Sequence, residues 1–435
     1  KCTTETADIW KEEPPVNQGK RRWSVLASGI IVMLLIGLQY AWSIFRPYLS
    51  TMFPTWTATN LSTVFTVSMV VFSVSMFICG KLQMKWGCRL TLLIAAVLMC
   101  IGFLGASALD VANPDGSYIR LIIFYGVFCG AAVGFGYNTS LSVVPFWFPK
   151  NFGLIVGVLM MAYGISSLIL GGATQVIIHA YNIMTAFRIL AVVSALLMLA
   201  AAFFMKRAPQ VPASEKSEEE KLHTGRDYTT MQMLATSTFW LCMFAGVVRA
   251  AGGLAVINSA ATIALYYGAP ALVGMMVSFF NALGRISAGA IHDRFGYRVG
   301  LLLNAFVGLS ASICLIFGNL TRFIPIILCG FAFAGLAYGG ANPVLMAFMK
   351  EAFGEKYYAT NVGIAGLTVL PASFLGPLLT GALQDASPDT NLYGTTFIAM
   401  LVLYGMNTIF TFCYLNAMKN MKERENLRGH QEING

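Results

Sequence analysis

The feature that most constrains this chain is a succession of apolar runs of about 20 residues or more, separated by short polar connections. A helix needs roughly 20 apolar residues to cross a hydrocarbon core about 30 Å thick. Charged residues make up 11% of the 435 positions, less than half the roughly 25% of an ordinary soluble domain. The first run, at 23–48, is too long for a signal-peptide core and has no small-residue cleavage site behind it. We therefore predict an all-α protein that crosses the membrane many times.

The apolar runs form two groups of six on either side of a charge-dense stretch, SEKSEEEK. The predicted membrane helices lie near 23–48, 61–80, 90–109, 119–145, 153–179, 184–205, 238–266, 271–291, 299–318, 323–348, 360–384 and 393–416. This pattern predicts five regions: an N-terminal tail at 1–22, a six-helix bundle at 23–205, a solvated linker at 206–237, a second six-helix bundle at 238–416 and a C-terminal tail at 417–435.

The basic residues predict the orientation in the membrane. If both termini are cytoplasmic, 22 of the 28 Lys and Arg residues fall on the cytoplasmic side, in agreement with the positive-inside rule. We therefore expect a multi-pass protein of the inner or plasma membrane. The net charge of +9 is spread over many short loops, so topology explains it better than nucleic-acid binding does.

Motifs of enzymes and of metal or nucleotide sites are missing from the sequence. Seven of the nine cysteines fall in apolar runs, and no CxxC spacing occurs, so a metal site is not expected. No Gly-x₄-Gly-Lys-Ser/Thr loop is present, which argues against ATP-driven transport. We expect no enzymatic activity, no cofactor and no nucleic-acid partner, and a monomer that works in the lipid bilayer.

One ten-residue segment occurs twice, at the same place in each group of six helices. The first copy, GKLQMKWGCR, spans 80–89, and the second, GAIHDRFGYR, spans 289–298. Both keep two glycines and a final arginine, whereas Met84 in the first copy stands where the second has Asp293. The repeat indicates an internal duplication, and duplicated six-helix halves are a transporter architecture.

The duplicated segment resembles the signature loop of the major facilitator superfamily, Gly-x₃-Asp-x₂-Gly-x-Arg/Lys, which follows helices two and eight. Stretches at 37–43 (GLQYAWS), 130–138 (GAAVGFGYN), 147–154 (WFPKNFGL) and 233–240 (MLATSTFW) are similar to the oxalate:formate antiporter family, relatives of the monocarboxylate transporters. The resemblance covers essentially the whole chain. It implies two pseudo-symmetric six-helix bundles, a small carboxylate substrate, and an inner gate formed by Gly80, Gly87, Arg89, Gly289, Asp293, Arg294, Gly296 and Arg298.

Two arginines fall inside predicted membrane helices. Arg285 lies in the eighth helix and Arg249 in the seventh, and all 19 Asp and Glu residues fall in loops, tails or the linker. A charge at such depth costs at least ~2.5–3.5 kcal/mol on insertion scales, so each arginine needs a partner or a wet cavity. We infer that the substrate supplies the negative charge, because a guanidinium binds a carboxylate with two parallel hydrogen bonds. Arg249 has the alternatives of binding backbone carbonyls or snorkelling.

The resemblance assigns further roles around Arg285. It implies that an arginine at this point of helix eight grips the substrate carboxylate. Asn281 shares the helix face of Arg285, and the monocarboxylate transporters carry a proton-linked aspartate there. The oxalate exchanger adds a lysine in helix eleven, whose place here is taken by Val369. Either Arg249 replaces that second cation or the substrate carries one carboxylate.

Other polar and aromatic residues in apolar surroundings are candidates for the wall of the substrate cavity. Their amide and phenol groups suit the orientation of a small anion, although each is equally suited to an interhelical hydrogen bond. They are Gln39, Tyr40, Tyr137, Asn138, Tyr163, Tyr338 and Asn342.

The expected mechanism is alternating access, in which the two halves rock about a site near the midplane. Reorientation of the empty carrier costs free energy, because its site holds an uncompensated positive charge. This cost favours the exchange of one anion for another. The alternatives are a proton-linked carrier of lactate-like or pyruvate-like monocarboxylates and, more remotely, a non-transporting sensor on the same scaffold. His179 and His292, at the ends of helices five and eight, are the titratable candidates for a proton-linked carrier.

Overall fold

The computed structural model describes residues 15–208, 227–388 and 391–434, and the secondary structure in these ranges is helical. Eleven helical segments of this part of the chain are long and apolar enough to cross a membrane. The expected tail at 1–22 and linker at 206–237 lie partly outside the described residues. The prediction of an all-α, multi-pass membrane protein is confirmed.

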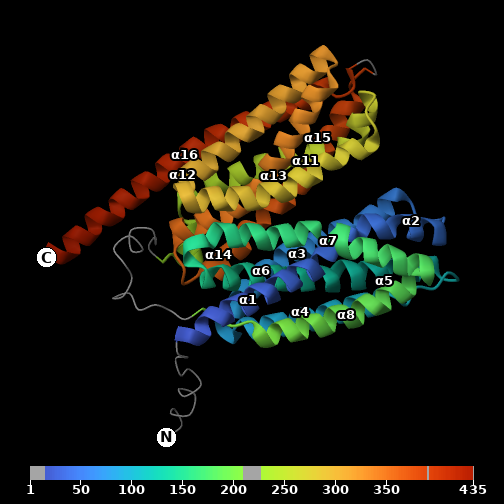
Figure 1. Ribbon diagram of the computed structural model, residues 1–435, viewed down its shortest axis with the longest axis horizontal. Coiled ribbons are helices and arrows are strands. Elements are labelled where there is room, and N and C mark those ends of the chain that lie inside the picture. Colours follow the sequence, from blue (N-terminus) through green and yellow to red (C-terminus); the bar gives the residue numbers. More distant parts are fainter. Residues whose placement is uncertain (1–14, 209–226, 389–390, 435) are drawn as a thin grey trace, which may run out of the picture.

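The helices form two halves that lie beside each other (Figure 1). The N-terminal half contains α1 (Pro15–Ile36), η2 (Gly37–Ala41), α2 (Trp42–Met52), α3 (Ala58–Trp86), α4 (Cys88–Ala106), α5 (Pro114–Leu121), η3 (Ile122–Cys129), α6 (Gly130–Val143), η4 (Val144–Trp147), η5 (Pro149–Asn151), α7 (Phe152–Ala180) and α8 (Ile183–Phe204). The C-terminal half contains α10 (Thr230–Leu234), α11 (Ser237–Tyr266), η6 (Ala271–Gly274), α12 (Met275–Thr321), α13 (Ile324–Phe353), α14 (Tyr358–Ala365), η7 (Gly366–Thr368), α15 (Val369–Asp385) and α16 (Gly394–Asn434).

One long helix accounts for the difference between eleven segments and the twelve predicted crossings. Helix α12 has 47 residues and would measure about 70 Å if straight, roughly twice the thickness of the hydrocarbon core. Its backbone leaves the helical region at Gly296, with φ 79° and ψ 170°. Helices eight and nine therefore meet at Gly296 with no intervening loop.

The two copies of the repeated segment share a backbone conformation. Gly87, between α3 and α4, has φ 83° and ψ 166°, which closely matches Gly296. This region of conformational space is open almost exclusively to glycine, because it has no Cβ. The match supports a duplicated six-helix unit, and the glycine at this position lets each half make the same sharp corner.

Polar side chains fix where several membrane helices begin. Thr57 and Asn60 form a reciprocal capping box at the start of α3, with both backbone-to-side-chain hydrogen bonds at 3.1 Å. Asn182 accepts from the Thr185 amide at 2.7 Å to cap α8. Such caps satisfy amides that have no partner within the helix.

Three of the predicted membrane helices contain a segment that is not α-helical. The first passes through the 3₁₀ turn η2, the fourth through the π-helical segment η3, and the eleventh through the 3₁₀ turn η7. The sequence predicted all three as continuous apolar runs. Non-α segments inside membrane helices frequently mark functional sites.

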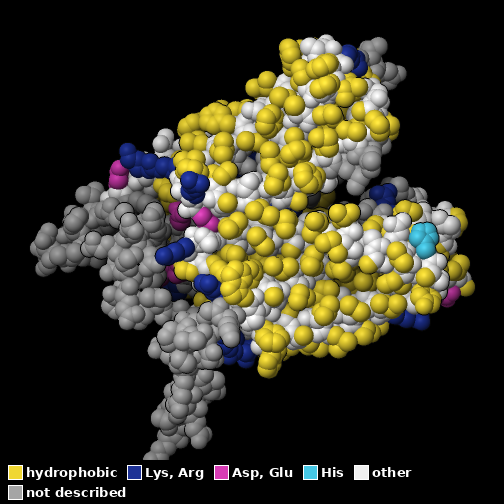
Figure 2. Space-filling model, in the orientation of Figure 1, with side chains coloured by type: hydrophobic (Ala, Val, Ile, Leu, Met, Phe, Trp, Pro, Cys, Tyr) yellow, Lys and Arg dark blue, Asp and Glu magenta, His cyan; other side chains and the backbone are white. Residues whose placement is uncertain are grey.

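The halves pack tightly at the end of the molecule that carries both chain termini, which we call the termini end. There Gly80 of α3 lies against the backbone of Ala359 in α14, and Gly153 of α7 lies against Gly289 of α12. A Cβ at any of these glycines would overlap the opposing backbone, so the contact depends on small residues. Away from the termini end the halves diverge, and Figure 2 shows a hollow between them.

The last helix extends beyond its predicted end. Helix α16 runs from Gly394 to Asn434, so the residues expected as a C-terminal tail at 417–435 are helical up to 434. Lys419 and Glu423 form an ion pair at 3.8 Å with i,i+4 spacing on this extension, an arrangement that favours a helix at the surface.

Candidate functional site

Arg285 is buried in α12 at the contact with α7, where 8% of it is exposed. Its Nε donates a hydrogen bond to Asn281 Oδ1 at 3.3 Å, in keeping with their four-residue spacing. Nη1 donates to the backbone carbonyl of Met160 in α7. In the described part of the chain, no carboxylate lies within 4 Å of the guanidinium. Both N–H groups of Nη2 and one of Nη1 are therefore available to a ligand.

Tyrosines from both halves cluster around Arg285. The side chains of Tyr137, Tyr163 and Tyr338 lie near its charge, and Tyr40 lies near all three. The Tyr163 ring lies 5.0 Å from that of Tyr40 and 5.2 Å from that of Tyr137. The structure therefore brings five of the residues predicted from the sequence to one place between the halves.

Gln39 orients one of these tyrosines. It lies in η2, where its Nε2 donates to Ser68 Oγ at 2.8 Å and its Oε1 accepts from the Tyr163 hydroxyl at 3.0 Å. Tyr137 and Tyr338 have no hydrogen-bond partner for their hydroxyl groups among the side chains that the structure describes. Gln39 thus positions Tyr163, while the other two hydroxyls are available to a ligand.

The remaining predicted wall residues lie in different surroundings. Asn138 is fully buried, and its Nδ2 donates to the carbonyls of Met76 at 2.6 Å and Ala359 at 3.0 Å, which joins the two halves. Asn342 is half-buried on α13, one turn beyond Tyr338 on the same helix face.

Arg249 lies apart from the cluster around Arg285. It is 3% exposed, and one terminal nitrogen donates to the Ala341 carbonyl of α13 at 3.4 Å. Its charge lies near Cys242 on its own helix and near Tyr404 and Tyr414 on α16. The two membrane arginines therefore occupy different environments.

Asp293 joins the halves at the termini end. Its two carboxylate oxygens accept hydrogen bonds from the Gly153 and Leu154 amides, each at 2.7 Å. These amides belong to the start of α7, where a negative charge is favoured by both the helix dipole and the unsatisfied amides. At the equivalent place in the N-terminal half, Met84 Sδ accepts from the Thr360 hydroxyl of α14 at 3.1 Å, so no charge caps α14 from this side chain.

The arginines of the repeated segment make local contacts. Arg89 donates to the carbonyls of Phe203 at 3.1 Å and Met205 at 3.2 Å, which covers the end of α8. Arg298 donates to the Tyr297 hydroxyl at 3.2 Å, and the Arg294 guanidinium lies 5.4 Å from the centre of the Phe295 ring. Asp293 is therefore the member of the predicted gate that reaches the opposite half through its side chain.

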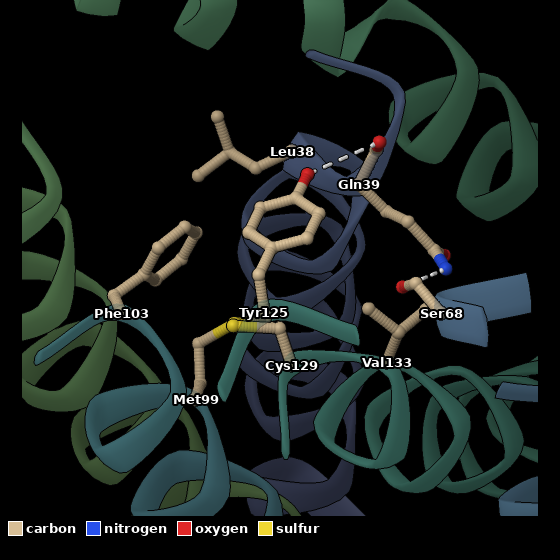
Figure 3. Close-up of a pocket in the computed structure, with 8 residues that line it drawn as sticks. All are labelled: Leu38, Gln39, Ser68, Met99, Phe103, Tyr125, Cys129 and Val133. Atoms are coloured by element: carbon tan, nitrogen blue, oxygen red, sulfur yellow. Dashed lines mark hydrogen bonds between the residues drawn. The ribbon is translucent and has the colours of Figure 1, made fainter. Parts of the chain in front are cut away.

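A small cavity lies inside the N-terminal half, beside Gln39 (Figure 3). Most of its lining is apolar, and the Tyr125 hydroxyl within it donates to the Gln39 carbonyl at 3.5 Å. It is lined by Leu38, Gln39, Ser68, Met99, Phe103, Tyr125, Cys129 and Val133. Since no cation lines this cavity, it does not suit a carboxylate.

The sequence did not indicate two residues of α7 that shape the Arg285 site. Met160 contributes only its backbone carbonyl, so no pattern of side chains in the sequence could indicate its role. At Gly164 an added Cβ would lie 3.0 Å from Arg285 Nη1 and 3.1 Å from Cζ. Gly164 follows the predicted Tyr163 directly, but its role depends on a contact between helices that are far apart in sequence.

Comparison with known proteins gives relatives over most of the chain. The chain is 25% identical over 360 residues to the uncharacterized MFS-type transporter YhjX of Escherichia coli, covering 80% of this chain and 85% of the relative. It is 22% identical to the oxalate:formate antiporter of Oxalobacter formigenes, covering 89% and 91%. It is 21% identical to monocarboxylate transporter 2 of Rattus norvegicus, covering 87% and 79%.

The fold is shared with solved transporters at low sequence identity. The crystal structure of FucP in the outward conformation aligns with a TM-score of 0.69 and 13% identity, covering 89% of this chain and 98% of FucP. A double tryptophan mutant of XylE aligns with a TM-score of 0.67 and 16% identity, covering 92% and 96%. The sequence profile of the Major Facilitator Superfamily matches residues 26–377 and 250–432. The chain therefore belongs to the Major Facilitator Superfamily, a family of membrane transporters.

Proposed function

We propose that this protein carries a small carboxylate anion across the membrane by alternating access, and that Arg285 binds the carboxylate. The observation that carries the proposal is the buried Arg285 guanidinium, which has no carboxylate within 4 Å in the described chain. The available N–H groups on Nη1 and Nη2 suit a bidentate carboxylate. The hydroxyl groups of Tyr137 and Tyr338 supply further donors from opposite halves.

The relatives support this class of substrate. One is named an oxalate:formate antiporter and another a monocarboxylate transporter, and both names refer to small carboxylates. The ligand needs at least one carboxylate, because the positive charge of Arg285 has to be neutralised. Arg249 is not among the proposed direct contacts with the substrate, because its neighbours are Ala341 and residues of α16.

The contacts between the halves support alternating access. The termini end is closed by small-residue contacts and by the Asp293 cap on α7, while a hollow separates the halves elsewhere (Figure 2). With both termini on the cytoplasmic side, this arrangement opens the site to the outside. Reorientation then requires the termini end to separate and the opposite end to close.

We propose anion exchange as the mode of coupling. Asn281 is the side chain that bonds Arg285 Nε, and an amide does not titrate. Return of the empty carrier would expose a buried, uncompensated arginine, so a second anion is the most favourable companion for the return step.

A proton-linked carrier is the second candidate, and one contact favours it. His292 is 5% exposed, and its Nε2 lies 2.9 Å from Glu351 Oε1 of α13, next to the Asp293 cap. Imidazole and carboxylate groups are common donors and acceptors of protons in proteins. This pair lies at the gate, whereas no carboxylate lies within 4 Å of Arg285 in the described chain.

Uptake of radiolabelled oxalate, formate, lactate and pyruvate into proteoliposomes tests both candidates. We expect uptake that requires internal anion and does not depend on an inward proton gradient. Uptake into anion-free vesicles driven by the gradient would replace exchange with proton-linked transport. No saturable uptake of any of the four anions would contradict the proposed substrate class.

Two variants test the role of Arg285. Arg285→Gln should abolish uptake, and Arg285→Lys should lower the affinity at least about tenfold, because an ammonium group cannot bind the carboxylate bidentately. Arg188→Gln, at an exposed position on α8, is the matched control and should transport normally. Wild-type uptake by Arg285→Gln would contradict the assignment.

A further inference from the structure

A second group of buried polar atoms lies between α11 and α16, in the C-terminal half. It contains Arg249 Nε, the hydroxyl groups of Tyr404, Thr411 and Tyr414, and both polar atoms of the Asn407 amide. Each of these side chains is at most 3% exposed. None of the named atoms makes a hydrogen bond of good geometry to a residue that the structure describes, although the Tyr414 hydroxyl lies close to Thr411 and Arg249.

These atoms face one another because of how the two helices pack. Residues 404, 407, 411 and 414 follow the spacing of a single helix face. Gly252 of α11 lies against the Tyr404 ring, with an added Cβ 3.0 Å from its nearest atom. Tyr414 lies near Cys242, which is two turns before Arg249 on α11. Since α11 and α16 are antiparallel, these two contacts place Asn407 level with Arg249.

Buried polar atoms rarely stay without hydrogen bonds, because each loses its contacts with water. Arg249 adds a full charge that cannot be removed by deprotonation. Its guanidinium donates a long hydrogen bond of 3.4 Å to the Ala341 carbonyl. In the described chain no carboxylate lies within 4 Å of it. The charge of Arg249 therefore has no neutralising partner in the described chain, and the missing partner should be negative.

We propose that this group of residues binds a small inorganic anion of halide size, and that chloride is the ligand. The site offers an arginine N–H, three hydroxyl donors and an amide NH₂, while the amide oxygen and the hydroxyl oxygens are the competing acceptors. This excess of donors around a cation suits an anion. A monoatomic anion fits better than an organic one, because Tyr404, Asn407 and Thr411 are 0% exposed.

The bound chloride has a defined role in the fold. It neutralises Arg249 and joins α11 to α16 through hydrogen bonds from both helices. Arg249 then belongs to a structural anion site rather than to the carboxylate site around Arg285. The proposal is independent of the transported substrate.

Halide-dependent stability of the purified full-length protein tests the site. Thermal unfolding is followed during titration with sodium chloride or sodium bromide, at ionic strength held constant with sodium methanesulfonate. The titrations use the wild type, Arg285→Gln and Arg249→Gln. We expect a saturable rise of the unfolding midpoint with halide in the wild type and in Arg285→Gln, and no rise in Arg249→Gln. Loss of the rise in Arg285→Gln, or its retention in Arg249→Gln, would overturn the proposal.

A milder variant covers the case in which Arg249→Gln does not fold. Thr411→Val removes one donor with little change in shape and should weaken the apparent halide affinity about tenfold, as expected for the loss of one charge-assisted hydrogen bond. Unchanged affinity would contradict the donor set. Crystals soaked in bromide should show an anomalous peak within hydrogen-bond distance of Arg249 Nε, and a map with water alone at this place would overturn the assignment.

Discussion

At the scale of single residues, the Arg285 site depends on a small neighbouring residue as much as on its polar neighbours. Asn281 and the Met160 carbonyl hold the guanidinium from two sides. Gly164 lies against it on α7 and contributes no side chain. A ligand can approach the guanidinium only if these neighbours leave part of it uncovered, so Gly164 is as necessary to the proposed site as the tyrosines are.

Gly164→Ala should weaken substrate binding without unfolding the protein. The added methyl group would lie 3.0 Å from Nη1 and 3.1 Å from Cζ of Arg285, which forces the guanidinium to shift. We expect the KM for uptake to rise about tenfold, the equivalent of one misplaced charge-assisted hydrogen bond. Gly172→Ala is the matched control, because it lies on the same helix with no atom within 4 Å of its added methyl. Equal KM values for the two variants would contradict the role of Gly164.

At the scale of helices, the sequence predicted where the membrane helices lie better than where they depart from α-helical geometry. Apolar length and charge predicted the twelve crossings, and the repeat predicted equivalent segments at 80–89 and 289–298, in which the structure has sharp corners at Gly87 and Gly296. The interruptions η2, η3 and η7 were not predicted, because a 3₁₀ or π turn inside an apolar run depends on contacts with neighbouring helices. The sequence predicted that Arg285 lies at the substrate site. It did not predict that Arg249 faces α16, because that depends on the rotation of α11 about its axis, which the composition of the helix does not determine.

The corner between helices eight and nine gives a test of stability. Gly296 has φ 79° and ψ 170°, so Gly296→Ala should lower the free energy of unfolding by about 1–3 kcal/mol through backbone strain. Gly300→Ala, one turn later in regular α12, has no atom closer than 3.6 Å to the new methyl group and should be neutral or slightly stabilising. Denaturant unfolding in detergent measures both. A larger loss at Gly300 would contradict the assignment of the corner.

The cap on α7 gives a second prediction at this scale. Asp293→Asn removes the negative charge that accepts from Gly153 and Leu154, which should weaken closure of the termini end by about 1 kcal/mol, or roughly fivefold. Met84→Asp should have the opposite effect, because it places a carboxylate near the start of α14, where Met84 meets Thr360.

Alkylation of a cysteine at the closed contact measures both changes. Ala359→Cys is suitable because Ala359 is 8% exposed and lies against Gly80, provided that the native cysteines are replaced. We expect faster labelling with Asp293→Asn and slower labelling with Met84→Asp. The same labelling rate in all three proteins would show that the cap does not control closure.

At the scale of the whole molecule, the structure corresponds to one end of the proposed transport cycle. The halves meet through glycines at the termini end, and the hydrogen bonds of Asn138 and Asp293 cross the same contact. Such a contact can close and reopen because little side-chain rearrangement is needed. The Arg285 cluster draws residues from both halves, so a relative rotation of the halves changes access to the site and the spacing of its donors together.

Gly153→Val should stop the cycle by preventing closure of the termini end. Its Cβ would lie 2.7 Å from the Gly289 carbonyl oxygen and 2.9 Å from Asp293 Oδ1, and a rigid backbone contact cannot yield as a side chain can. We expect exchange in proteoliposomes to fall to background, while substrate still raises the thermal unfolding midpoint because the Arg285 site remains intact. Gly172→Val on the same helix meets no atom within 4 Å and should exchange at the wild-type rate. Exchange by Gly153→Val at that rate would mean that transport proceeds without the closed contact, and the rocking mechanism would have to be abandoned.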